Sequence, residues 1–108
     1  MSKNGLIVKT DGSIHRFVYD GLSSLQDAVQ GYIEAISLDD FTIFVNEEGK
    51  LDDLPVNPVA TLFWKIELNK SGFKLNDVIC GDAVILGGCD DEGETLGLTD
   101  SQLKLFNQ

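Results

Sequence analysis

The stretch SSLQDAVQGYIEAI, residues 23–36, has the hydrophobic spacing that decides the fold. Its apolar residues recur three or four positions apart, which is the spacing of one face of an α-helix. Ser23 followed by Gln26 is typical of a capping box, in which the serine oxygen accepts a hydrogen bond from the backbone of the first helical turn. The sequence therefore predicts one continuous amphipathic helix over residues 23–36, with these residues facing the core: Leu25, Ala28, Val29, Tyr32, Ile33 and Ile36.

Two strand-like runs joined by a turn precede this helix. Residues 6–10 and 14–19 are rich in β-branched and aromatic side chains. Asp11-Gly12 lies between them and tolerates the positive φ that a tight hairpin turn needs. Residues 41–45, which follow the helix, have a similar composition and predict a further strand.

A turn and a helix start come after this further strand. Gly49 belongs to the turn and is expected to supply its positive φ. Asn57 followed by Pro58 marks a helix start, because asparagine caps a helix and proline suits its first position. Residues 58–68 fit two interpretations, since their apolar residues match helical spacing and, from Leu62 onward, strand alternation equally well. The helix is favoured, and the strand is the alternative.

The last third of the chain predicts one more strand and a short helix. Residues 78–86 are mostly apolar around Gly81-Asp82, which indicates a strand with a bulge or a bend. Thr99 and Gln102 form a second capping box, so a short helix is expected over residues 100–106.

These elements predict a single α+β domain over residues 1–108. A chain of 108 residues is the usual size of one domain. The expected architecture is a largely antiparallel sheet, with the long helix packed on one face and a short helix at the C-terminus. A domain of this size buries only a little more than about 60 % of its unfolded surface, so a homodimer that buries more apolar area is a reasonable expectation.

Charge is the most unusual property of the composition. Eighteen acidic residues against eight basic ones give a net charge of −10 and a pI near 4.2. This charge excludes a broad basic face for direct binding of nucleic acid or of an anionic membrane. The sequence also has no apolar run near the roughly 18–20 residues that span a bilayer, and no signal-peptide core, which predicts a cytoplasmic protein.

Candidate catalytic and metal-ligating residues are few. The chain contains one histidine and two cysteines, and the spacing of Cys80 and Cys89 matches no redox or zinc motif. The carboxylates at residues 90–94 lack the register of a calcium-binding loop. The sequence therefore predicts no enzymatic activity, no cofactor and no metal site.

Three short motifs follow one another in the middle of the chain: N-E-E-G-K at residues 46–50, L-P-V-N at residues 54–57 and A-T at residues 60–61. Their order resembles the signature of a small domain-of-unknown-function family common in bacteriophages, plasmids and some bacterial genomes. The resemblance implies a compact α+β domain in a cytosolic setting, often on a mobile element, and it provides no catalytic residue. The polar residues that such a shared surface would offer for binding are Asn46, Glu47, Glu48 and Asn57.

Two functions of different classes fit these observations. Carboxylates gather within residues 39–53 and 90–94, where they either keep the protein soluble or steer a basic partner toward it. The favoured hypothesis is a non-enzymatic interaction protein, of phage or mobile-element type, that binds a host or self protein partner through its acidic surface. The alternative is a small-ligand-binding module, compatible with an oligomer, whose pocket lies near residues 46–57.

Overall fold

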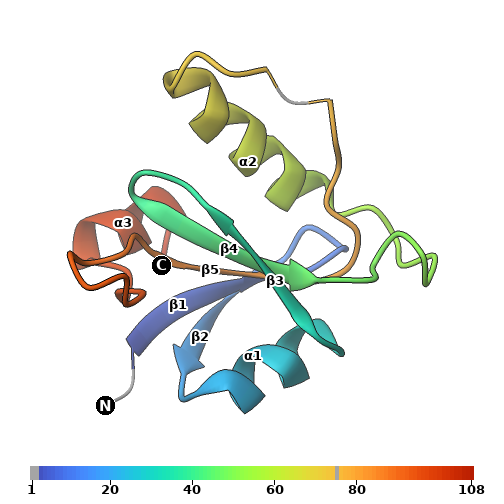
Figure 1. The fold of residues 1–108 in the computed structure, drawn as a ribbon, viewed down its shortest axis with the longest axis horizontal. Coiled ribbons are helices and arrows are strands. Elements are labelled where there is room, and N and C mark those ends of the chain that lie inside the picture. Colours follow the sequence, from blue (N-terminus) through green and yellow to red (C-terminus); the bar gives the residue numbers. More distant parts are fainter. Residues whose placement is uncertain (1–2, 75) are drawn as a thin grey trace.

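A five-stranded antiparallel sheet forms the centre of the protein, with helices on both of its faces (Figure 1). The computed structural model describes residues 3–74 and 76–108. The strands lie in the order β2-β1-β5-β4-β3, so the last strand of the chain separates β1 from β4. In chain order the elements are β1 (Lys3–Val8), β2 (Ile14–Tyr19), α1 (Leu22–Val29), β3 (Ile33–Ser37), β4 (Phe41–Asn46), α2 (Pro58–Lys70), β5 (Ala83–Gly87) and α3 (Asp100–Leu105).

The two strands β4 and β5 are buried on both faces of the sheet. Every residue of both strands is buried, which agrees with their continuous rather than alternating apolar sequence. Because side chains alternate along a strand, neighbours in sequence contribute to different cores. Ile43 and Ile85 pack toward α2 and α3, whereas Phe44 and Val84 pack toward α1.

The prediction of one continuous helix over residues 23–36 is wrong beyond Val29. Helix α1 ends there, because Gln30 adopts a left-handed conformation with φ of 61° and its N–H donates to the Gln26 carbonyl. The residues that follow form β3, which pairs antiparallel with β4. The predicted capping box at Ser23 and Gln26 is also absent, since Gly21 is the N-cap and no side chain caps the helix.

A side chain from β4 binds the C-terminal end of this helix. The Asn46 amide nitrogen donates to the carbonyl of Val29 at 3.1 Å and to that of Gln30 at 3.4 Å. Gly31 leaves room for this amide, since a Cβ at Gly31 would lie 2.7 Å from the Asn46 nitrogen. Asn46 thus satisfies carbonyls that the end of a helix leaves unpaired.

The apolar residues of the predicted helix are divided between the two faces of the sheet. Leu25 and Val29 of α1 are each only 2 % exposed. Ile33 of β3 packs with the α1 core, whereas Ile36 packs with the core under α2. The single long helix on one face is therefore replaced by α1 on one face and by α2 and α3 on the other.

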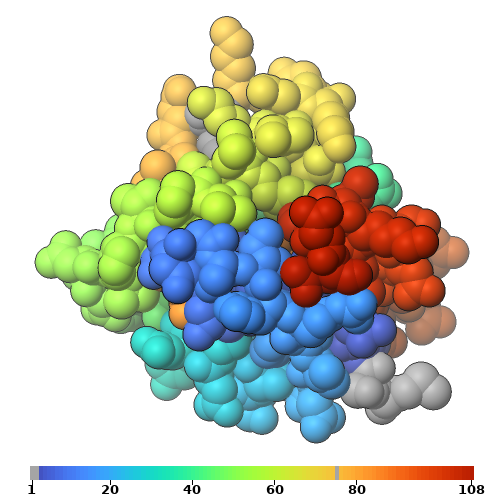
Figure 2. All heavy atoms as spheres, turned by 180° about the vertical axis from the view of Figure 1, so that it is seen from behind, coloured from blue at the N-terminus to red at the C-terminus, as the bar shows by residue number. Residues whose placement is uncertain are grey.

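Helix α2 settles the ambiguity of residues 58–68 in favour of a helix. Asn57 caps it, and its side-chain oxygen accepts a hydrogen bond from the Ala60 N–H at 3.1 Å. Phe63 faces the sheet and makes an edge-to-face contact with Phe41, with ring centroids 4.9 Å apart. Phe63 also packs against Phe106, which follows α3. Seen from behind, the C-terminal residues lie at the surface beside the β1–β2 hairpin and α2 (Figure 2).

Most other local predictions are confirmed, although the strand predicted over residues 78–86 begins only at Ala83. The β1–β2 hairpin, the strand at residues 41–45, the bend at Gly81 and the Thr99–Gln102 capping box are all present. Gly49, however, does not have a positive φ. Glycine is needed there because a Cβ would lie 2.7 Å from the carbonyl oxygen of Cys80.

The Asn57 side chain links the sheet to α2 through hydrogen bonds. It is 0 % exposed, and its amide nitrogen donates to the carbonyls of Val8 at 2.8 Å and Gly81 at 3.0 Å. With the bond from Ala60, one side chain connects the end of β1, the bend before β5 and the start of α2.

Replacing Asn57 by alanine should therefore destabilise the protein strongly. The change removes a helix cap and leaves the buried Val8 and Gly81 carbonyls without their donor, at an expected total cost of about 2–4 kcal/mol. Urea denaturation followed by circular dichroism measures this loss. The control is Asn69→Ala, an exposed position on α2, which should change stability by less than about 0.5 kcal/mol. Equal effects of the two substitutions would refute the role given to Asn57.

Candidate functional site

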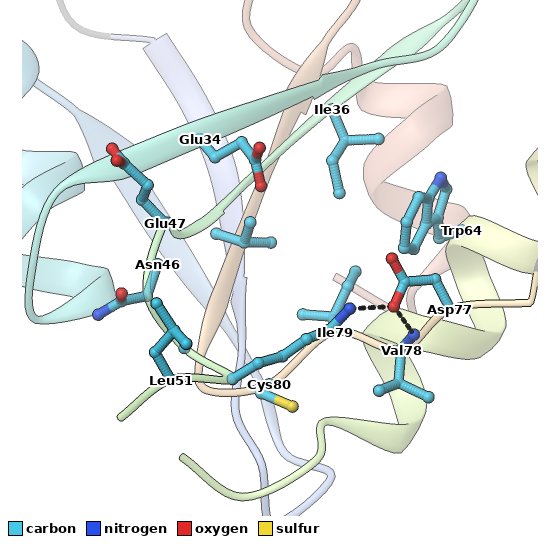
Figure 3. A pocket seen from close by; sticks show the side chains of 13 residues that line it. Glu34, Ile36, Asn46, Glu47, Leu51, Trp64, Asp77, Val78, Ile79 and Cys80 are labelled. Carbon is cyan, nitrogen blue, oxygen red and sulfur yellow. Dashed lines mark hydrogen bonds and ion pairs between the residues drawn. The ribbon is translucent and has the colours of Figure 1, made fainter. Parts of the chain in front are cut away.

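A pocket of about 350 Å³ lies between the β3–β4 hairpin and α2 (Figure 3). Residues 49–51, which follow β4, and residues 77–80, which precede β5, complete its walls. The pocket is thus built from four segments, which are β3, residues 45–51, α2 and residues 77–80. This position matches the predicted neighbourhood of residues 46–57 only in part, because β3, α2 and residues 77–80 were not expected to contribute.

The inner wall of the pocket is apolar. Val45 and Ile79 are buried, with 7 % and 3 % of their surface exposed. Ile36 and Trp64 are half-buried and stand above them. Trp64 comes from α2 and presents its ring to the cavity (Figure 3).

The outer rim of the pocket is charged. Glu34 lies on β3 opposite Val45, so its side chain points to the same face of the sheet as the pocket. Glu47 follows directly after β4, and Asp77 lies beside Trp64 (Figure 3). Lys50 is the fourth charged residue of the rim and forms an ion pair with Asp77. The rim therefore carries three carboxylates against one ammonium group.

The Asp77 carboxylate is held in its ionised form. The Lys50 ammonium group hydrogen-bonds to it and lowers its pKa below the ordinary 3.8, and the Val78 N–H, which donates to the same oxygen at 2.8 Å, lowers it further. The ion pair joins two of the four segments that form the pocket. About half of each side chain is exposed, so the pair is weakened by solvent and salt.

The four binding residues predicted from the sequence have different environments. Asn46 lines the pocket, but its amide bonds to α1 and its side-chain oxygen accepts the Glu48 N–H at 2.8 Å. Glu47 lines the pocket and is exposed. Glu48 is exposed outside the pocket lining, and Asn57 is fully buried with its amide bonded to the Val8 carbonyl. The structure thus brings Asn46 and Glu47 to one cavity, and the binding role of the four residues stays a prediction.

Sequence patterns do not single out three further residues of the pocket, Glu34, Trp64 and Asp77. Glu34 falls on the polar face of the predicted helix, and only its strand conformation turns it toward Trp64. Asp77 lies in a loop with no motif around it. The one local signal is Gly31, which the prediction accepts inside the helix at a cost of about 1 kcal/mol but which could have indicated a break before Glu34.

Other candidate residues lie apart from the pocket. His15 is exposed on β2, where its ring nitrogen lies 3.1 Å from the Ser13 hydroxyl. Residues 90–94 form an exposed turn in which the Asp90 carboxylate accepts the N–H groups of Glu92 and Glu94. Within residues 3–74 and 76–108, no three histidine, cysteine, aspartate or glutamate side chains are placed to hold a metal ion. The helices of this described part are also too short or too polar to cross a membrane.

The fold and the pocket define a small α+β domain with a charged cavity at one edge of its sheet. A family model described as "Domain of unknown function (DUF3846)" matches residues 3–108, so the chain belongs to this family. The resemblance to a domain-of-unknown-function family is thereby supported, while the proposed signature and its distribution among phages and plasmids stay predictions. No curated protein and no solved structure gives a significant match to the chain.

Removing the Lys50 charge should raise the pKa of Asp77. In Lys50→Gln the remaining Val78 N–H lowers that pKa less than the ammonium group and the N–H do together. Because the folded pKa of Asp77 is lowered, its contribution to stability is present at neutral pH and lost as the pH falls below about 3.8. An NMR titration of the carboxyl carbons measures the shift, with Lys104→Gln on α3 as the control. An unchanged Asp77 pKa in Lys50→Gln would contradict the ion pair.

Proposed function

We propose that this protein is a non-enzymatic interaction module that binds a basic segment of a partner protein at the pocket beside Trp64. The observation that carries the proposal is the combination of an aromatic wall with a rim rich in carboxylates. A lysine or arginine side chain matches both parts, because its aliphatic stem packs on apolar surface while its charged end stays at the rim.

A lysine or arginine side chain of the partner can interact with the Trp64 ring and with the carboxylates of the rim. The face of a tryptophan ring attracts an ammonium or guanidinium group, and this attraction is worth about 0.5–1 kcal/mol at exposed sites. Glu34 and Glu47 are exposed at the rim and can form charge-assisted hydrogen bonds with basic side chains of the partner. The net charge of −10 adds a long-range attraction that speeds the encounter with a basic partner.

The proposal also states the kind of partner, the cellular compartment and the genomic origin of the protein. Of the host and self partners predicted from the sequence, a host protein fits a basic segment better, and the protein acts in the cytoplasm as a product of a phage or another mobile element. The resemblance of residues 46–61 to a family found in such genomes supports this setting.

Reversing the charge of the rim should abolish capture of the partner. The variant Glu34→Lys with Glu47→Lys is used as immobilised bait in a host-cell lysate, beside the wild type, at low and at high salt. The wild type should retain a protein that is released as added salt shortens the Debye length to about 3 Å at 1 M. The rim variant should retain about tenfold less of it, because the rim then repels a basic segment.

The control variant has the same net charge as the rim variant and differs only in where the charges are changed. Asp91→Lys with Glu92→Lys makes the same change in charge on the exposed turn at residues 90–94, away from the pocket. This control should capture the partner nearly as well as the wild type does. If the two variants lose capture to the same extent, total charge rather than the pocket determines binding, and the proposal fails.

A second candidate function is the binding of a small organic ligand in the same pocket. Its volume of about 350 Å³ falls within the roughly 300–1,000 Å³ of small-molecule sites, and its inner wall is apolar. This function requires no partner protein, so it predicts stabilisation by a free metabolite.

A thermal-shift screen with nucleotides and metabolites tests this second candidate. A ligand present at a hundred times its Kd should add about 2.7 kcal/mol of stability and raise the Tm. The shift should disappear in Trp64→Ala and persist in Leu62→Ala, whose side chain is 57 % exposed on α2. A Tm that no compound moves would exclude small-ligand binding among the classes screened.

A further inference from the structure

Strand β3 leaves one edge of the sheet open beside the pocket. Among the described residues, β3 pairs with β4 alone and ends the strand order. The pairing continues beyond both ends of β3, where the Glu47 N–H donates to the Tyr32 carbonyl at 2.9 Å and the Leu38 N–H donates to the Phe41 carbonyl at 2.8 Å. Pairing with β4 thus extends over the full length of β3, and no described strand pairs with its other edge.

This register determines which backbone groups are free. In an antiparallel pair, alternate residues bond to the same neighbour. Since Tyr32 and Leu38 bond to the β4 side, Glu34 and Ile36 do so as well. The N–H and carbonyl groups of Ile33, Ala35 and Ser37 point the other way, toward the open edge. Such a row of unpaired groups is a template for another strand.

The open edge and the pocket share two residues. Glu34 and Ile36 have their backbone groups directed at β4 and their side chains in the pocket lining. A strand added antiparallel to β3 would place two of its own residues directly opposite these positions, on the same face of the sheet. Side chains opposite each other in a strand pair have Cβ atoms about 4.5–5.5 Å apart. The two side chains of an added strand that lie opposite Glu34 and Ile36 would thus be placed beside the pocket lining.

The charges of the site select the occupant. An added residue opposite Glu34 lies beside a carboxylate, with Glu47 and Trp64 within the same pocket. A residue opposite Ile36 meets an apolar side chain. A second copy of this chain is a poor occupant, because it brings another Glu34 and another net charge of −10 to the edge. A basic segment of another protein complements the site.

We propose that the partner binds as an extended strand added to the edge of β3, with a lysine or arginine opposite Glu34 and an apolar residue opposite Ile36. The inference rests on the function proposed above and specifies its partner. Backbone hydrogen bonds give the added strand its affinity, and the pocket selects its side chains. Read from the N-terminus of an antiparallel partner strand, the recognised pattern is an apolar residue, any residue, then a basic residue.

Synthetic peptides test the charge requirement directly. The amidated, acetylated peptide STVTRTS carries the pattern, and STVTETS replaces its arginine by glutamate. Trp64 is the single tryptophan of the chain, so its fluorescence reports occupation of the pocket. STVTRTS should change this emission on titration, and STVTETS should bind about tenfold more weakly or not at all. Equal binding of both peptides, or binding of neither, would overturn the inference.

A proline at Ala35 tests the strand addition. The Ala35 N–H faces the open edge, so Ala35→Pro removes a donor that the β3–β4 pairing does not use, and proline is tolerated at such edge positions. STVTRTS should bind this variant about tenfold more weakly. The control is Val18→Pro on β2, the opposite edge of the sheet. The Lys9 N–H donates to the Ser13 carbonyl, and by the same alternation the Val18 N–H points away from β1.

The outcomes separate this inference from the function on which it rests. If Glu34→Lys with Glu47→Lys abolishes partner capture while Ala35→Pro leaves capture and peptide binding unchanged, the interaction module stands and the added strand is refuted. If sedimentation velocity finds a wild-type dimer that Ala35→Pro converts to a monomer, a second copy occupies the edge and the inference is overturned. A monomeric wild type whose peptide binding is lost only in Ala35→Pro supports it.

Discussion

The hydrogen bonds from the Asn46 amide to the carbonyls of Val29 and Gln30 determine how the rest of the structure is arranged. They end α1 at a point where the side-chain pattern would continue the helix. The residues beyond are then free to pair with β4 as β3. Without β3, Glu34 would not face Trp64, the sheet would end at β4, and the pocket would lack one wall. A single amide thus separates a helix from the strand that shapes the candidate site.

Elements defined by neighbouring residues could be predicted from the sequence. The β1–β2 hairpin, the Asn57 cap and the Thr99–Gln102 capping box each depend on groups within a few positions of one another. The end of α1 could not be predicted in this way, because its decisive partner lies 16 residues or more along the chain. Gly31 was the local sign of that long-range contact, and Gly49 likewise makes room for a distant carbonyl, that of Cys80.

The candidate site was only partly predictable for the same reason. The motif at residues 46–50 leads to Asn46 and Glu47, which do line the pocket, but not to Lys50 of the same motif, which forms the ion pair with Asp77 at the rim. Trp64, Glu34 and Asp77 arrive from three other segments, and no spacing in the sequence relates them. Asn57 looked like a surface residue because it is polar. Its complete burial follows from two backbone carbonyls and one N–H that all need a partner.

The place of β5 between β1 and β4 has a consequence for the newly made chain. During synthesis, two separate hairpins, β1–β2 and β3–β4, emerge well before residues 83–87 leave the ribosome. Until then Leu6, Val8 and Phe44 lack the β5 residues that lie opposite them in the sheet. The edges of β1 and β4 that β5 later joins are open to wrong pairing. Completion of the sheet is thus a late, non-local step, and a chain interrupted before β5 is expected to aggregate rather than to fold in part.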